Sequence, residues 1–182
     1  MSFDTVRHDS TSKSDIREAI LIIWDVERKD FMQNSYDYEI NKGTLCLIQE
    51  GDNSTKVIEL NNEYEVNKNI HKIIDESCRS FGSTLKGRNE GTKDLTGIKY
   101  KAPIIISEYL SIIMIPTGST RGNICHWISL NSIKRVEKDE NNLAIIEFIN
   151  GKNVRLDVSY YVVENQLAKA VRLDFCLKKK YS

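Results

Sequence analysis

The sequence of 182 residues has little of what marks several large classes of protein. It contains two prolines and nine glycines, which excludes collagen-like repeats and low-complexity disorder. Its longest apolar runs, such as Ala19 to Trp24 and Ile112 to Ile115, are far shorter than the roughly 20 residues of a membrane-spanning helix. Because the N-terminal segment MSFDTVRHDSTSKSD lacks an apolar core, we expect no secretory signal. The length is that of about one domain.

Cysteine is also scarce, and its spacing fits no common site. The four cysteines are Cys46, Cys78, Cys125 and Cys176; no two of them form a C-x-x-C pair, so we expect neither a zinc site nor a disulfide framework. Cys125 is followed by His126, which leaves a cysteine hydrolase as the weakest of three functional hypotheses. Adjacent residues in a strand point to opposite faces. We therefore expect no catalytic residues, no metal and no cofactor.

Net charge is absent as well, because 26 basic side chains balance 26 acidic ones. A net charge of zero normally argues against a nucleic-acid-binding protein. The balance is uneven, however: residues 1–65 carry a net charge of −7 and residues 66–182 a net charge of +7. Such an asymmetry is typical either of ordinary solvated surfaces or of an acidic segment attached to a surface that binds polyanions.

The pattern of apolar residues divides the chain into two parts. Residues 1–35 predict an acidic N-terminal extension with one amphipathic helix, in which Asp15 is a suitable N-cap for an apolar stripe from Ile16 to Trp24. Residues 36–182 predict a single domain. It begins with the short strand-like runs DYEI, TLCLI and KVIEL, separated by the turn sequences NKG and GDNS.

A helix is predicted next, over residues 68–81. Its apolar residues recur at helical spacing, Asn67 or Asn69 can cap it, and Gly82 follows where a C-terminal glycine ends a helix. Cys78 belongs to this apolar stripe, so we expect it to be a core residue rather than a reactive thiol.

Residues 83–101 predict a basic loop. Three glycines punctuate it, and its basic residues are Lys86, Arg88, Lys93, Lys99 and Lys101. Glycines let a backbone approach a phosphate closely, although an ordinary solvated loop has the same composition. The order G-x-x-x-x-G-K-[ST] is missing, which excludes a P-loop. A second loop, TGSTRGN, carries Arg121. Both loops flank a predicted hairpin of residues 103–106 and 112–115, so we expect them to share one surface.

The remainder predicts further strands and a terminal helix. Strands are expected at residues 127–130, 133–136, 143–149 and 154–158, with a type I′ turn at Asn150-Gly151. A helix after Ser159 has an apolar stripe of Val163, Leu167, Ala170, Val171 and Leu177. The predicted fold class is therefore α+β: a mostly antiparallel sheet, open or rolled, with two main helices packed against it.

Several segments resemble the ComK family of competence transcription factors. They are IIDESCRSFGSTLKGRNEGT (residues 73–92), KAPI (101–104), IPTGSTRGNICHWIS (115–129), EFINGK (147–152) and VSYYVVENQ (158–166), with YEIN (38–41) matching the N-terminal region. The segments follow one another in the family's order and at its spacing, over roughly residues 36–177. Each segment is weak alone, but their combination is specific.

The resemblance implies a cytoplasmic transcriptional activator of Gram-positive bacteria that switches on genes for DNA uptake. Members of the family bind paired A/T-rich boxes of double-stranded DNA, mainly through the minor groove, and act as homodimers or dimers of dimers. An adaptor that delivers them to a Clp protease controls their level. Whether that control extends to this chain stays open, because family members usually continue beyond the last helix with the adaptor-binding segment.

Individual roles follow from physical chemistry rather than from the resemblance. The narrow minor groove of A/T-rich DNA attracts inserted cations, which we assign to Lys86, Arg88 and Arg121. Phosphate contacts are assigned to Lys93, Lys99 and Lys101, and Arg79 is expected to join the same surface from its helix. The alternative hypothesis is a β-rich protein-interaction module that does not bind DNA, with the segment from Ile16 to Trp24 as its interaction helix.

Overall fold

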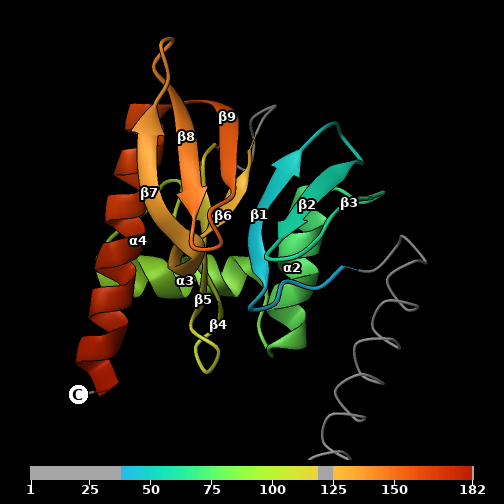
Figure 1. The fold of residues 1–182 in the computed structure, drawn as a ribbon. Helices are drawn as coiled ribbons and strands as arrows, with labels where there is room; N and C mark the ends of the chain where they lie inside the picture. Colours follow the sequence, from blue (N-terminus) through green and yellow to red (C-terminus); the bar gives the residue numbers. More distant parts are fainter. Residues whose placement is uncertain (1–37, 119–124, 182) are drawn as a thin grey trace, which may run out of the picture. The chain divides into compact units, whose positions relative to one another are not determined.

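The computed structural model describes residues 38–118 and 125–181, which contain three α-helices and nine strands in two sheets (Figure 1). The predicted extension of residues 1–35 and Arg121 lie outside the described residues. The helices are α2 (Ile70–Ser80), α3 (Leu85–Thr96) and α4 (Tyr160–Tyr181). The strands are β1 (Thr44–Gln49), β2 (Thr55–Glu59), β3 (Glu63–Val66), β4 (Ile104–Ser107), β5 (Ile112–Pro116), β6 (Trp127–Ser129), β7 (Ile133–Lys138), β8 (Leu143–Phe148) and β9 (Asn153–Ser159).

The larger sheet has six strands in the order β3-β2-β1-β6-β5-β4, and the smaller one has the order β7-β8-β9. Every pair of neighbours is antiparallel. The edge strands of the larger sheet, β3 and β4, do not pair with each other. The sheet is therefore open and forms no closed barrel among the described residues. These findings confirm the predicted α+β class.

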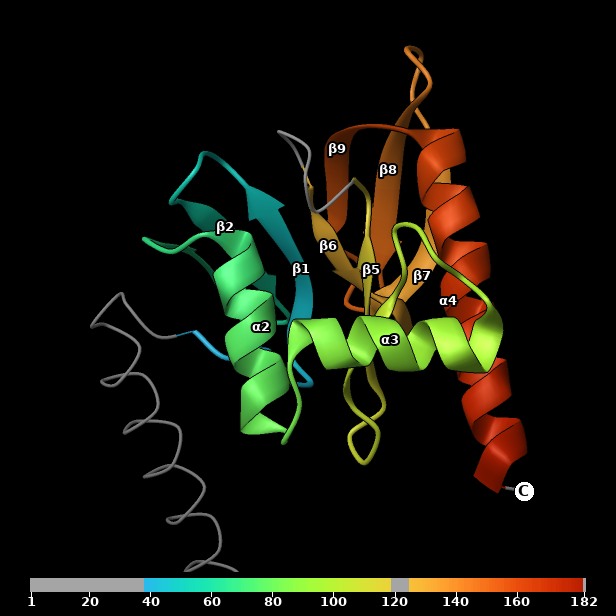
Figure 2. The ribbon, with the colours of Figure 1, turned by 180° about the vertical axis from the view of Figure 1, so that it is seen from behind.

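Both faces of the larger sheet are covered, which explains why β4 and β5 are apolar at successive positions. Helices α2 and α3 lie over one face (Figure 2), where the ring of Trp127 meets that of His71 edge to face with centroids 6.4 Å apart. The opposite face packs on the smaller sheet and α4: Ile128 shares a buried cluster with Ile146 and Leu173. Adjacent strand residues point to opposite faces, so Trp127 and Ile128 contribute to two separate cores.

The run DYEI was predicted to be a strand, and for residues 38–40 this is wrong. Tyr38 and Ile40 are buried while Glu39 is exposed, which produces the alternation that suggests a strand. The backbone N–H of Ile40 donates instead to the Ser77 hydroxyl of α2, at 3.0 Å. The strand β3, which the sequence analysis missed, completes the meander with β1 and β2.

The loop predicted over residues 83–101 is also wrong in its larger part, since residues 85–96 form α3. Thr84 caps the helix by accepting from the Gly87 N–H at 3.0 Å, and Gly97 ends it with a φ of 75°. The buried side of α3 carries two threonines: Thr92 donates to the carbonyl of Pro103, and Thr96 donates to that of Thr92. Hydrogen-bonded threonines replace apolar residues there, so the helix leaves no apolar period in the sequence.

The turn between β8 and β9 differs from the prediction in type. Gly151 has a φ of 81°, whereas Asn150 is absent from the residues with positive φ, so the turn is not type I′. The Gly151 N–H donates to the carbonyl of Phe148, and the Phe148 N–H donates to that of Lys152. This is the pattern of a three-residue loop, in which only the glycine must be left-handed.

In α4 the predicted stripe is confirmed except at one position. Val163 and Ala170 are fully buried, and Leu167 and Leu177 pack against the same cluster. Val171 is 53% exposed, and Leu173 takes its place in the core. With Leu173 in place of Val171, the packed residues recur every three or four positions along one continuous face of the helix.

Candidate nucleic-acid interface

The hairpin of β4 and β5 places the predicted site residues at two separate ends. Ile104 pairs with Met114 in antiparallel register, so the segment before β4 lies beside the segment after β5. Gln166 of α4 binds both segments, since its Nε2 donates to the carbonyls of Lys101 (2.8 Å) and Pro116 (2.6 Å). Lys101 therefore lies near the start of the loop that carries Arg121.

Three of the predicted residues, Arg79, Lys86 and Arg88, lie toward the opposite end of α3. The helix has 12 residues, which corresponds to a length of about 18 Å at 1.5 Å per residue. Arg88 reaches Glu108 in the turn between β4 and β5, whereas Lys99 and Lys101 follow the C-terminal end of α3. The predicted set therefore consists of two groups rather than one.

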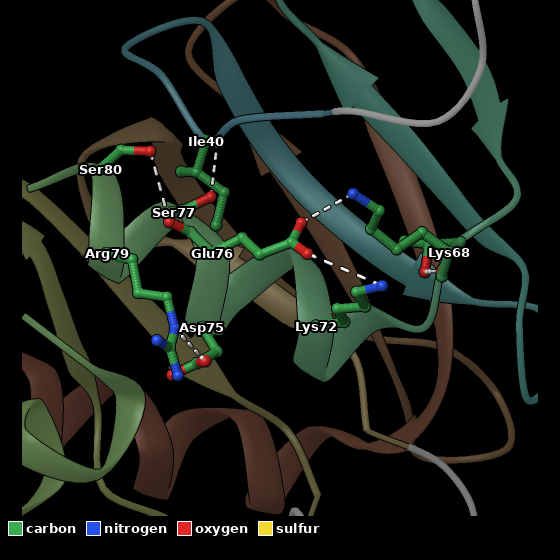
Figure 3. Close-up of polar contacts among 9 residues, drawn as sticks. Ile40, Lys68, Lys72, Asp75, Glu76, Ser77, Arg79 and Ser80 are labelled. Carbon is green, nitrogen blue, oxygen red and sulfur yellow. Dashed lines mark hydrogen bonds and ion pairs between the residues drawn. The ribbon is translucent and has the colours of Figure 1, made fainter.

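Arg79 is paired within its own helix. Its Nε donates to Asp75 at 2.8 Å, one turn earlier (Figure 3), and this hydrogen bond raises the pKa of the Arg79 guanidinium. The pKa of Asp75 is lowered, first by the backbone N–H of Leu85 at 2.8 Å and then by Arg79. The pair thus joins the end of α2 to the start of α3.

Arg88 is largely enclosed, with 17% of its side chain exposed. Its Nη2 donates to the carbonyls of Phe81 and Ile106, both at 3.3 Å, and its Nη1 lies 3.4 Å from Glu108. These contacts connect α3 to the end of α2 and to β4. Lys86 is 87% exposed, and its Nζ lies 4.0 Å from the carboxylate of Glu90, one turn later in the helix. Of the group, Lys86 is the most accessible.

The second group differs because its charges are unpaired. Lys93, Lys99 and Lys101 are exposed and form no ion pair with any described residue. Lys169 and Arg172 of α4, which the sequence analysis missed, likewise form no ion pair with any described residue; Arg172 is exposed and Lys169 is half-buried. Lys169 and Arg172 lie three residues apart and therefore on one face of α4. Only the packing of α3 against α4 brings this face close to Lys101.

Lys101, Lys169 and Arg172 line a groove of about 590 Å³ between the segment after α3 and α4. We call it the cationic groove. The other residues that line it are Ile98, Val162, Asn165, Gln166 and Ala168. The lining contains three cations and no carboxylate. At neutral pH the groove therefore carries a local positive charge in a protein whose total charge is zero.

Lys169 is held in position at the base of this cluster. Its Nζ donates to the carbonyl of Tyr100 at 3.0 Å and to Oε1 of Gln166 at 2.7 Å. Burial and, to a lesser extent, the nearby charge of Lys101 lower the pKa of Lys169. An ammonium group has three hydrogens, so one remains for a further acceptor. Lys101 has a φ of 48°, a left-handed conformation that is uncommon for lysine.

Three cations of the smaller sheet, by contrast, are paired with carboxylates. Lys134 and Arg135 bind Glu147 at 2.6 and 2.9 Å, and Arg155 binds Asp139 at 2.7 Å. The hydrogen bond from Lys134 lowers the pKa of Glu147, and that from Arg155 lowers the pKa of Asp139. Unpaired cations therefore lie together on the C-terminal half of α3, on the segment that follows it and on α4.

The geometry around Cys125 and His126 does not fit a nucleophile with its base. Burial raises the pKa of the Cys125 thiol, which disfavours the thiolate. His126 Nδ1 accepts the backbone N–H of Gln49 at 3.1 Å, and burial lowers the pKa of His126. Cys78 is fully buried with a pKa raised to about 11, which confirms it as a core residue.

None of the helices in residues 38–118 and 125–181 is long and apolar enough to span a membrane. In the same residues, no three histidine, cysteine or acidic side chains are grouped as a metal site would require.

Comparison with known proteins gives a match to one family. The model of the ComK protein family matches residues 35–182. The competence transcription factor of Bacillus subtilis (strain 168) is 35% identical over 139 residues, which cover 75% of this chain and 72% of that protein. No solved structure matches the chain significantly.

Proposed function

Because the chain belongs to the ComK family, we propose that it is a DNA-binding transcriptional activator of competence genes. It acts in the cytoplasm on A/T-rich promoter boxes, which it contacts largely through the minor groove. The observation that carries the proposal is the grouping of Lys101, Lys169 and Arg172, which form no ion pair with any described residue, around one groove. A neutral protein needs such a local surface to attract a polyanion.

Two kinds of contact with DNA are assigned to the basic residues. Lys93, Lys99 and Lys101 contact phosphates, which contributes affinity but no sequence information. Lys86 and Arg121 reach into the minor groove. The pair of Lys86 with Glu90 is an exposed contact at 4.0 Å, and such pairs contribute so little that a phosphate can replace the carboxylate.

Arg88 and Arg79 act mainly by positioning. The guanidinium of Arg88 is bound by two carbonyls and a carboxylate, so insertion into a groove would break three contacts. Arg79 stabilises the junction of α2 and α3 through Asp75. Its exposed side chain makes only a minor contact with the DNA.

The remaining partners are proposed on the same basis. The active form is a homodimer or a dimer of dimers, because paired boxes require two binding units. A Clp-protease adaptor controls its level.

The test is a binding titration of the full chain against two duplexes of equal length, one A/T-rich and one G/C-rich, with a minor-groove ligand as competitor. We expect preference for the A/T-rich duplex, displacement by the competitor, and affinity that falls steeply with salt. Equal affinity for both duplexes, or an affinity that does not change with salt concentration, would contradict the proposal. If the chain does not bind DNA but is recovered in a stoichiometric complex with one protein partner, the result would support the alternative of a protein-interaction module.

A further inference from the structure

The cationic groove is built from two segments that lie far apart in the sequence. Gln166 and Lys169 of α4 bind the carbonyls of Lys101 and Tyr100, which fixes the segment after α3 against α4. The same Gln166 binds the carbonyl of Pro116, directly before the loop that carries Arg121. Three cations therefore line a groove, and hydrogen bonds within the protein already fix the two segments that form it in the absence of a ligand.

The chemistry of the lining selects an anion with several oxygens. Arg172 offers a planar fork that matches two oxygens of one phosphate. Lys169 offers an ammonium with two of its hydrogens already bound to protein oxygens, and Lys101 adds a second ammonium. Ile98 and Val162 form aliphatic walls of the groove. No residue of the lining is a carboxylate that would compete with the anion for these donors.

We propose that the cationic groove binds one phosphodiester of the DNA backbone, with Arg172, Lys169 and Lys101 as its ligands. The inference rests on the proposed function and assigns two residues, Lys169 and Arg172, from a helix that the sequence does not connect with the predicted site. Because phosphate contacts carry no base information, the groove sets affinity and orientation, while the choice of A/T-rich sequence resides elsewhere.

The position of the groove agrees with this role. It lies at the C-terminal end of α3, beside the exposed Lys99, and Gln166 connects it to the start of the loop that carries Arg121. A strand whose phosphate is held there also passes close to the exposed Lys99. The ion pairs of the smaller sheet offer no comparable set of free donors.

The test compares salt dependence in matched variants of the full chain. The groove variant combines Lys101→Asn with Arg172→Gln; asparagine tolerates the left-handed backbone at this position better than most residues. The control combines Lys42→Asn with Arg135→Gln, which removes the same charge from the turn before β1 and from β7. Equal melting temperatures of the two variants and the wild type establish that all are folded.

We expect the groove variant to lose roughly tenfold in affinity at moderate salt, as for a charge-assisted contact. The slope of log Kobs against log salt should flatten by about 0.9, the effect of one phosphate. The preference for A/T-rich over G/C-rich DNA should stay unchanged, and the control should retain the wild-type slope.

The outcomes separate this inference from the proposed function. If the wild type prefers A/T-rich DNA and the groove variant keeps its slope, the groove assignment is wrong while the function stands. If the wild type does not bind DNA, both are wrong. If inorganic phosphate shifts the NMR signals of Lys169 and Arg172 and the DNA slopes are equal, the groove binds free anions and the assignment to DNA is wrong.

Discussion

At the scale of single residues, the environment of each arginine decides what it can do. Arg88 and Arg172 are both arginines on helices, yet Arg88 is bound by Phe81, Ile106 and Glu108, whereas Arg172 has no ion pair among the described residues. Arginine offers five donors in a fixed geometry. An arginine whose donors already bind the protein stabilises the fold, and one whose donors remain unused can bind a ligand.

This distinction predicts the effect of replacing Arg88. Arg88→Met should lower the free energy of unfolding by about 1–3 kcal/mol, because the carbonyls of Phe81 and Ile106 lose a charged donor. The matched variant Lys86→Met, at an exposed position of the same helix, should change it by less than about 0.5 kcal/mol. Chemical denaturation of both variants measures the difference, and equal stabilities would contradict the structural role of Arg88.

A second prediction concerns pH. Burial lowers the pKa of both His71 and His126, so the unfolded state takes up protons near pH 6.5 before the folded state does. This contribution to stability is present above about pH 6.5 and is lost as the pH falls toward the folded pKa. The lowered pKa values of carboxylates such as Asp75 affect stability only below about pH 4.5.

We therefore expect the denaturation midpoint to fall between pH 7 and pH 5. His126→Asn should reduce this fall, because the asparagine oxygen can take the place of Nδ1 and accept the N–H of Gln49 but does not titrate. A midpoint that is the same at both pH values, or a fall of the same size in the variant, would show that His126 does not stay neutral in the fold.

At the scale of secondary-structure elements, α3 determines where the basic residues lie. Gly91 lies in the middle of α3 with open space around it, whereas Gly97 ends the helix at a φ of 75°. Gly91→Ala should stabilise the protein by about 0.5–1 kcal/mol. Gly97→Ala should destabilise it by about 1 kcal/mol, since alanine disfavours the left-handed conformation.

Urea denaturation of both variants tests the assignment of α3. The two substitutions are chemically identical, so differences in side-chain size do not enter. If residues 85–96 were a loop, as their composition suggests, Gly91→Ala would bring no stabilisation.

The sequence predicted α2, β1, β2, the hairpin of β4 and β5, and α4, since an apolar period or a clear turn marks each of them. It failed for α3, whose buried residues are the polar Thr92 and Thr96, and for residues 38–40, where packing imitates a strand. Of the site residues, the pairing of Arg79 with Asp75 is implied by its spacing of four in a helix. The cationic groove is not implied, because Lys101 and Lys169 meet only through tertiary packing.

At the scale of the whole molecule, a net charge of zero hides an uneven distribution. Lys134, Arg135 and Arg155 of the smaller sheet are paired with Glu147 and Asp139, while Lys93, Lys99 and Lys101 have no such partner among the described residues. Acidic side chains in residues 1–65 bring the net charge of the whole chain to zero. The proposed salt-dependent attraction to DNA therefore depends on one surface rather than on the net charge.

The central claim is that this surface is the one that contacts DNA, and lysine modification tests it most directly. The full chain is treated with an amine-reactive reagent at low salt, with and without an A/T-rich duplex, and each lysine is quantified by mass spectrometry. We predict that the duplex protects Lys93, Lys99 and Lys101, while Lys42 and Lys134, exposed on other elements, react equally in both samples. Equal reaction of all five lysines, or protection of Lys134 alone, would contradict the claim.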